Sequence, residues 1–381
     1  MNRKQFIILL VLVAVVGAAG LFVRHQNRAS WKGAATTIGQ KLLPNLPVND
    51  IAQITIKAGA GEATLIKRDN LWRVHERGDY PANFSQISDL LLKFADLKVV
   101  QSEEIGPSQL GRFELLPPGS AANSGTLVEF KDAGGKVINS VLLGKKHQKK
   151  PAGNSPNDEG WPDGRYVMAG VNTRTLAVIA DPLDSVQTGP AAWLNKDFLS
   201  IENPRAIAVQ FPEATNSWKL TRASATNDWQ LANAAKDEKL DSTKVAKVTN
   251  PFGSPAFNDV AASNPAGQTN ATLMTVETFD GFTYVAQIGR EQAENYPVSF
   301  SIAATIPTQR IANKDEKPED QARLDKEFKD QQARLTGKLA KEKAFENWTY
   351  QLPAYSIDEV LKSRGQLMVD GSTNSPAPAQ P

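Results

Sequence analysis

Two stretches of this chain carry predicted secondary structure in the same order, and that order limits the folds open to it. The first stretch runs from Ile51 to Gly144 and the second from Ile207 to Gly289. The pattern of each stretch predicts a strand pair, a short strand that contains a tryptophan, a helix and a later hairpin. Each hairpin ends in an aliphatic residue, a glycine and a basic residue. We therefore predict an α+β fold in which two diverged tandem repeats form mainly antiparallel sheets.

The first repeat is predicted from alternating apolar residues and one amphipathic helix. Asp69 and Asn70 supply a turn that places Trp72 on the inner face of its strand. Asn83 or Ser85 caps the helix, whose apolar residues recur at steps of three and four. Residues rich in proline, glycine and charge predict a long exposed loop from 145 to 165. The other predicted elements are strands at 51–56, 63–68, 71–74, 126–130, 137–143, 165–170 and 175–180, and a closing helix and turn at 182–199.

The second repeat follows the same order with a shorter helix, which Asp241 caps. Trp229 corresponds to Trp72, and this paired placement favours two matching core positions over a platform for sugar binding. We assign the repeats to residues 30–200 and 201–370, and we expect a disordered tail at 371–381. The strands of the second repeat are predicted at 206–211, 218–222, 229–231, 272–278 and 282–288.

A charged helix, within an insertion at about 312–347, is present only in the second repeat. Pro318 and two acids open it, and lysines close it, so its dipole is complemented at both ends. A narrow apolar stripe along this helix predicts either packing on the surface of its own domain, which is favoured, or contact with a partner helix. The stripe consists of Leu324, Phe328, Leu335 and Leu339.

The N-terminal segment has the composition of a membrane span. An uninterrupted apolar run extends from Phe6 to Val23 between basic residues. As a helix it is roughly 27 Å long, close to a hydrocarbon core of about 30 Å. Small residues at 17–20 leave a cleaved secretory signal as the alternative, but the run continues past them, which favours an uncleaved anchor.

The basic residues on the two flanks of this anchor nearly balance, so charge does not decide its orientation. We assign the orientation from the short N-terminal tail instead. We expect residues 1–29 to form a cytoplasmic tip and a transmembrane anchor. The body is then periplasmic, on a single-pass protein of a bacterial inner membrane.

Composition and charge exclude several functional classes. Lysine and arginine number 43 against 41 aspartates and glutamates, and the two signs are interspersed, so we predict no nucleic-acid partner. Without cysteine the chain has no disulfide, thiolate nucleophile or cysteine-based metal site. The three histidines, His25, His75 and His147, lack the spacing of a triad or a zinc site. We predict no catalytic residue, no metal and no cofactor.

Two charged clusters lie in or beside the predicted loop. Asp158, Glu159 and Asp163 lack the alternating oxygen ligands of an EF-hand, so a polar hairpin tip is the favoured interpretation. The lysines between 145 and 150 suit anionic lipid or cell-wall polymer, with a solvated loop as the favoured alternative.

Several motifs together suggest a family resemblance. They are residues 42–56, Trp72 with Tyr80, Pro81 and Ala82, residues 110–118, Arg165 with Tyr166 and Val167, and Asp181, Pro182 and Leu183 with Trp193. These motifs resemble the domain-of-unknown-function family numbered 4340, although Glu114 departs from the pattern, since the family more often has glycine there. The resemblance implies a membrane-anchored bacterial envelope protein, often associated with an ABC-transporter ATPase and permease of the gliding-motility type, and it implies no catalytic residue.

Two functional hypotheses follow from these observations. In the first, the protein is a non-enzymatic scaffold or an accessory subunit of an ABC-type transport or gliding-motility-like complex, with integral membrane transporter subunits as partners. In the second, it is an envelope hydrolase or a ligand-binding module that acts on cell-wall polymer or lipid.

Overall fold

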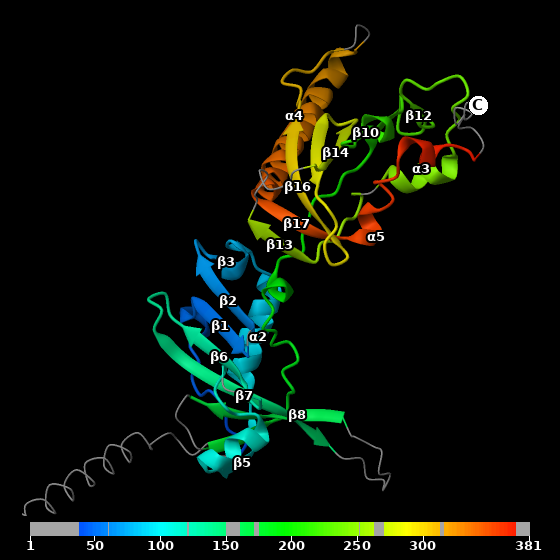
Figure 1. Ribbon diagram of the computed structural model, residues 1–381. Coiled ribbons are helices and arrows are strands. Elements are labelled where there is room, and N and C mark those ends of the chain that lie inside the picture. The colour runs from blue at the N-terminus through cyan, green and yellow to red at the C-terminus, as the bar shows by residue number, and fades with distance from the viewer. Residues whose placement is uncertain are drawn as a thin grey trace, which may run out of the picture. The chain divides into compact units, whose positions relative to one another are not determined.

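The computed structural model describes residues 38–59, 61–119, 122–149, 161–170, 175–250, 252–262, 270–312 and 316–370. The chain divides into two compact units, unit 1 up to Asn195 and unit 2 from Lys196 (Figure 1). The predicted anchor and the predicted C-terminal tail lie outside the described residues. No helix within the described ranges is long and apolar enough to cross a membrane.

The described residues of unit 1 form a nine-stranded antiparallel sheet and one α-helix. The strand order is β4-β3-β2-β1-β6-β7-β8-β9-β5. The helix is α2 (Phe84–Asp96). The strands are β1 (Gln53–Ala58), β2 (Gly61–Arg68), β3 (Leu71–Val74), β4 (Tyr80–Pro81), β5 (Val99–Glu104), β6 (Thr126–Lys131), β7 (Val137–Lys149), β8 (Trp161–Ala169) and β9 (Thr175–Ile179).

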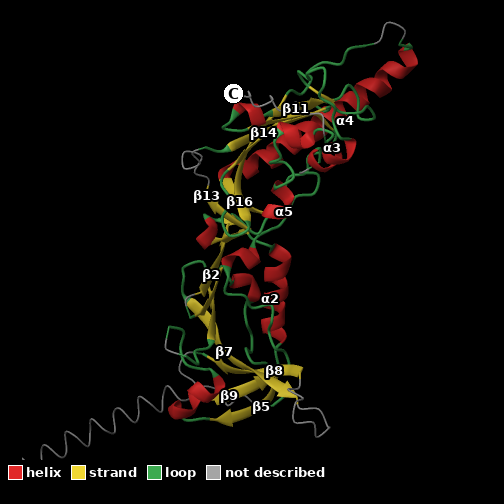
Figure 2. Ribbon diagram, turned by 45° about the vertical axis from the view of Figure 1, so that its right-hand side comes forward, coloured by secondary structure: helices red, strands yellow, loops and turns green. Residues whose placement is uncertain are grey.

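Helix α2 covers one face of this sheet (Figure 2). Phe94 of α2 meets Phe130 of β6 edge to face, with ring centroids 5.1 Å apart, and both side chains are fully buried. The predicted cap is present, because the Asn83 side chain accepts a hydrogen bond from the Gln86 amide. Alternate residues, such as Glu129 and Lys131, lie on the opposite face and form an ion pair at 2.9 Å. The apolar period of two therefore gives the sheet one covered face and one polar face.

The described residues of unit 2 form an eight-stranded antiparallel sheet with its helices on one face (Figure 2). The strand order is β12-β11-β10-β14-β15-β16-β17-β13. The helices are α3 (Ser242–Val248), α4 (Pro318–Lys343) and α5 (Ala354–Ile357). The strands are β10 (Pro204–Gln210), β11 (Trp218–Thr221), β12 (Gln230–Leu231), β13 (Asp259–Ala262), β14 (Thr272–Thr278), β15 (Phe282–Ile288), β16 (Asn295–Ala304) and β17 (Trp348–Pro353).

The two sheets share one strand order and one register. Apart from β4, each strand of unit 1 has a counterpart at the same place in unit 2, in the same chain order. Residues at the same pairing positions are apolar and almost fully buried in both units. The matched residues are Ile54 with Ile207, Leu65 with Leu220, Phe130 with Val276, Leu143 with Ile288, and Val167 with Val298.

The long exposed loop expected at 145–165 is shorter than predicted. Strand β7 continues to Lys149 and β8 begins at Trp161, so both ends of the expected loop are paired backbone. Main-chain hydrogen bonds hold such a hairpin without apolar side chains, and the composition of these residues therefore conceals the strands. The closing helix expected at 182–199 is a single 3₁₀ turn at Pro190–Trp193, with Trp193 fully buried.

Gly144 lies where the chain has no room for a side chain. A Cβ there would lie 2.3 Å from the carbonyl oxygen of Phe113 and 2.9 Å from Cγ of Leu115. We expect Gly144→Ala to lower the free energy of unfolding by about 1–3 kcal/mol, the usual cost of overpacking. Urea denaturation followed by tryptophan fluorescence measures the change. Gly189→Ala is the matched control, because a Cβ added at Gly189 would meet nothing within 4 Å; equal midpoints for the two variants would contradict the steric argument.

Candidate functional site

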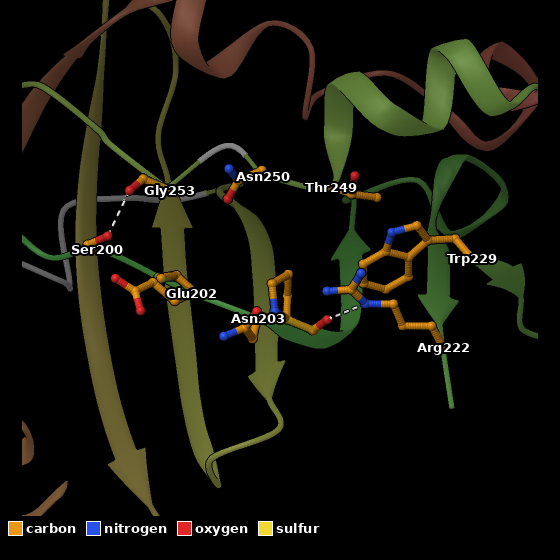
Figure 3. A pocket seen from close by; sticks show the side chains of 10 residues that line it. Ser200, Glu202, Asn203, Arg222, Trp229, Thr249, Asn250 and Gly253 are labelled. Atoms are coloured by element: carbon orange, nitrogen blue, oxygen red, sulfur yellow. Dashed lines mark hydrogen bonds between the residues drawn. The ribbon is translucent and has the colours of Figure 1, made fainter. Parts of the chain in front are cut away.

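A cleft in unit 2, with a volume of about 450 Å³, is lined mainly by polar side chains (Figure 3). Its residues come from the segment that leads into β10, from the residue just after β11, from the residue just before β12 and from the chain after α3. This volume lies within the range of about 300–1,000 Å³ typical of small-molecule sites. The lining residues are Ser200, Ile201, Glu202, Asn203, Pro204, Arg222, Trp229, Thr249, Asn250 and Gly253.

One end of the cleft is formed by Arg222 and Trp229, which lie side by side (Figure 3). Arg222 donates from Nε to the carbonyl oxygen of Pro204 at 2.7 Å and from Nη1 to that of Ala225 at 2.8 Å. Its Cζ lies 4.7 Å from the centroid of the Trp229 ring, within the range of a cation–π interaction. Backbone carbonyls and an aromatic ring thus hold the guanidinium in place.

Trp229 occupies the same register position as Trp72. Trp72 lies two residues before Val74, which pairs with Leu65, and Trp229 lies two residues before Leu231, which pairs with Leu220. Trp72 is buried, with 6% of its surface exposed, but Trp229 is only half-buried. The prediction of matching core positions is therefore right for Trp72 and wrong for Trp229. In unit 1 the strand β4 pairs beside β3, whereas β12 is the edge of its sheet.

The other end of the cleft carries Ser200 and Glu202 (Figure 3). Ser200 donates its hydroxyl proton to the carbonyl oxygen of Gly253 at 2.7 Å, so that proton is not directed to a base. Glu202 is exposed. Asn250 packs directly on Gly253, where a Cβ would lie 2.3 Å from Asn250 Nδ2. This arrangement offers hydrogen-bond donors and acceptors for binding, without a nucleophile–base pair.

Two of the three histidines pair with aspartates in unit 1. His147 Nδ1 lies 2.6 Å from Asp163 Oδ1 and His75 Nδ1 lies 3.3 Å from Asp79 Oδ1. Asp163, expected at a hairpin tip, thus lies on β8 opposite β7. His25, Asp158 and Glu159 lie outside the described residues. Among the side chains that the structure describes, no three histidines or acids are grouped to hold a metal ion.

Part of the predicted basic cluster is engaged within unit 1. Lys145 Nζ lies 5.5 Å from the ring centroid of Phe113 and 5.8 Å from that of Tyr166. Lys146 forms an ion pair with Asp184. These contacts leave fewer charges available to an anionic surface than the residue count suggests.

The family model for "Domain of unknown function (DUF4340)" matches residues 72–273, a little more than half of the chain. The chain belongs to this family. Comparison with curated proteins and with solved structures gives no match. In this DUF4340 protein the match includes the whole cleft and ends before α4.

Glu114, which we expected to depart from the family pattern, adopts a left-handed backbone conformation with φ 56°. Glycine reaches this region without steric cost, whereas a residue with a Cβ does not. Glycine, the residue expected at this turn from the resemblance, would therefore fit the backbone without strain, and the turn has its left-handed form here with glutamate in place.

The predicted contact stripe of α4 divides between the interior and the surface of unit 2. Leu335 is buried, with 3% of its surface exposed. Leu324, Phe328 and Leu339 are half-buried. The stripe therefore packs on its own domain at Leu335 and keeps partly accessible apolar surface at the other three positions.

Buried polar contacts hold the C-terminal half of α4 on the sheet. The Tyr284 hydroxyl donates to Oε2 of Glu342 at 2.7 Å, and Glu342 is 6% exposed. Lys338 lies 4.0 Å from the Glu342 carboxylate and 4.7 Å from the Phe282 ring centroid. Glu346, beyond the helix, accepts a hydrogen bond from the Ile302 amide at 2.6 Å. A single lost contact here leaves a buried charge or hydroxyl without its partner.

A surface ion network holds the N-terminal half of α4. Arg310 donates to both carboxylate oxygens of Glu316, at 2.5 and 2.6 Å, and to Asp325 at 2.7 Å. A bidentate guanidinium–carboxylate pair fixes geometry as well as charge. These hydrogen bonds raise the pKa of Arg310, so it stays charged across the accessible pH range.

Burial raises the pKa of Glu342, although the hydrogen bond from Tyr284 and the charge of Lys338 oppose the shift. The folded state therefore favours the protonated carboxyl, and the associated stabilisation is complete below the ordinary pKa of 4.5 and is lost as pH rises through the folded pKa. We expect Glu342→Gln to gain stability relative to wild type as pH rises from 4.5 toward neutral. Urea titrations at several pH values measure this difference, with Glu319→Gln on the exposed first turn of α4 as the control. A difference that stays constant with pH would contradict the assignment.

Proposed function

We propose that this protein is a non-enzymatic scaffold in which two diverged copies of one α+β repeat present surfaces to other proteins of a bacterial envelope. The observation that carries the proposal is the common strand order and register of the two sheets. Eight strands placed alike, with buried apolar residues at matching positions, are typical of a duplicated structural unit. A repeated scaffold creates two related surfaces without requiring chemistry from either.

We further propose that the protein is an accessory subunit of an ABC-type transport or gliding-motility-like complex, anchored through Phe6 to Val23. The sequence supports an anchor because this apolar run has the length of a membrane span and follows basic residues. A scaffold with such an anchor contacts other proteins of the same membrane. Integral transporter subunits are the partners that fit such an arrangement.

Helix α4 is the proposed contact with these partners. It is inserted between β16 and β17, whose counterparts β8 and β9 follow each other directly in unit 1. Shared core positions serve the fold of both copies, so a surface specific to one copy is the better candidate for recognition. Leu324 and Phe328 offer partly exposed apolar side chains between charged neighbours, the composition typical of a helix-in-groove contact.

Site-specific photo-crosslinking in native membranes tests this proposal. With a benzophenone amino acid at Phe328, we expect covalent capture of an integral permease or its ATPase, identified by mass spectrometry after detergent extraction. Phe84 is the matched control, because it is an aromatic residue on α2 with 67% of its surface exposed. Capture at both positions alike, or recovery of this chain alone at native expression, would count against α4 as the contact.

A further inference from the structure

We propose that the cleft of unit 2 is a binding site for a neutral saccharide, which it holds without cleaving. The inference goes beyond the scaffold function, because it concerns a small-molecule site rather than the α4 surface. It rests on the charge of the lining, on the donors and acceptors that the lining presents, and on the way unit 2 departs from unit 1 at this point.

The charge of the lining favours a neutral ligand. Among the lining residues that the structure describes, Arg222 is the one cation and Glu202 the one carboxylate, so their formal charges cancel. Arg222 is also poorly placed to clamp an anion, because Nε already donates to Pro204 and Nη1 to Ala225. The side-on bidentate mode that carboxylates and phosphates prefer requires Nε. A single hydrogen bond from Nη2 to a hydroxyl remains compatible with this geometry.

The lining presents many hydrogen-bonding groups beside one aromatic ring. Asn203 and Asn250 lie between the Arg222–Trp229 end and the Ser200–Glu202 end (Figure 3). Each amide offers donors and an acceptor, which suits hydroxyl groups that are themselves both. Arg222 covers one face of the indole. The remaining apolar surface of the ring and its polar edge match the C–H and O–H groups of a sugar ring.

The cleft lies beside β12, at an edge where the described residues of unit 2 have no strand corresponding to β4. In unit 1 the Ala82 amide donates to the Trp72 carbonyl at 2.8 Å, and Ala82 pairs in turn with Leu194. Lys67 lies opposite Trp72 there, and Arg222 stands at the corresponding position in unit 2. Where β4 has no counterpart, the equivalent tryptophan is left half-buried beside a cation.

Binding without cleavage follows from the number of acids. Glycoside hydrolysis generally requires two carboxyl groups on either side of the scissile bond, roughly 5–10 Å apart. In the described part of the cleft lining, Glu202 is the one carboxylate. The envelope-hydrolase alternative therefore finds no support in this cleft, whereas capture of a sugar does.

Ligand-observed NMR and calorimetry on the full chain test the site. The chain is extracted in a polyoxyethylene detergent, because maltoside and glucoside detergents carry competing sugars. N,N′-diacetylchitobiose, cellobiose and maltose are the saccharide probes, and glycylglycine and inorganic phosphate are the zwitterionic and anionic probes. We expect saturation transfer to at least one disaccharide and to neither charged probe. A tetrasaccharide of the sugar that binds distinguishes a polymer segment, which gains affinity with length, from a free disaccharide.

Asn203→Gly is the informative variant, because Asn203 has φ 49° and glycine keeps that backbone conformation while removing the amide. We expect about three- to tenfold weaker saccharide binding, the effect of one or two lost neutral hydrogen bonds. Asn45→Gly is the control, since Asn45 has φ 61° and belongs to unit 1, outside the cleft lining. Binding of glycylglycine or phosphate that depends on Arg222, absence of binding by all three disaccharides, or equal affinity of both variants would overturn the proposal.

Discussion

The pairing of β1 and β10 with their two neighbours is the constraint on which the rest of each unit depends. Ile54 lies between Leu65 and Phe130, and Ile207 between Leu220 and Val276, all almost fully buried. A slip of one residue would move each of these side chains to the polar face. Since burial of one such side chain contributes about 1.5–3 kcal/mol, the register is fixed by several residues at once. The register also decides where the helices pack, because only the apolar face of each sheet must be shielded from water.

In unit 2 the helix that covers the sheet makes a buried polar contact with it. In unit 1 the covering helix presents Phe94 to Phe130, an apolar contact throughout. In unit 2 Tyr284 and Glu342 meet between β15 and α4, where burial raises the pKa of both groups. A buried hydrogen-bonded pair contributes less net stability than apolar packing of the same area, but it fixes where the helix lies. The polar pair thus positions α4 against its sheet.

The elements that sequence patterns predict well are those with a strict period and a clear cap. Helix α2 begins after Asn83 as expected, and α4 begins at Pro318. Strands β5, β13, β16 and β17 are absent from the sequence-based expectation: β5 exposes five of its six residues, and β16 contains Pro297. Their pairing depends on distant strands rather than on their own composition.

The cleft escapes prediction for a similar reason. Its residues come from four separate segments, and none forms a motif by itself. The signal that could have found it is a missing segment, because nothing after Trp229 corresponds to Tyr80, Pro81 and Ala82. An absent covering segment changes the surroundings of the tryptophan at this register position: Trp72 is buried in the core of unit 1, whereas Trp229 borders the cleft of unit 2.

Helix α4 and the cleft distinguish unit 2 from unit 1, and both lie where they do not alter the strand register. Helix α4 is inserted in the connection between two adjacent strands, and the cleft opens beside β12, an edge strand two positions away from β10. An insertion in a connection leaves the ladder on either side intact, and a strand missing from an edge removes one pairing without shifting another. Changes at the centre would move buried side chains to water. Differences between the two units are therefore confined to a connection and to a sheet edge. For this reason the α4 surface and the cleft, rather than the matching core positions, are where the two units differ in the surface they present.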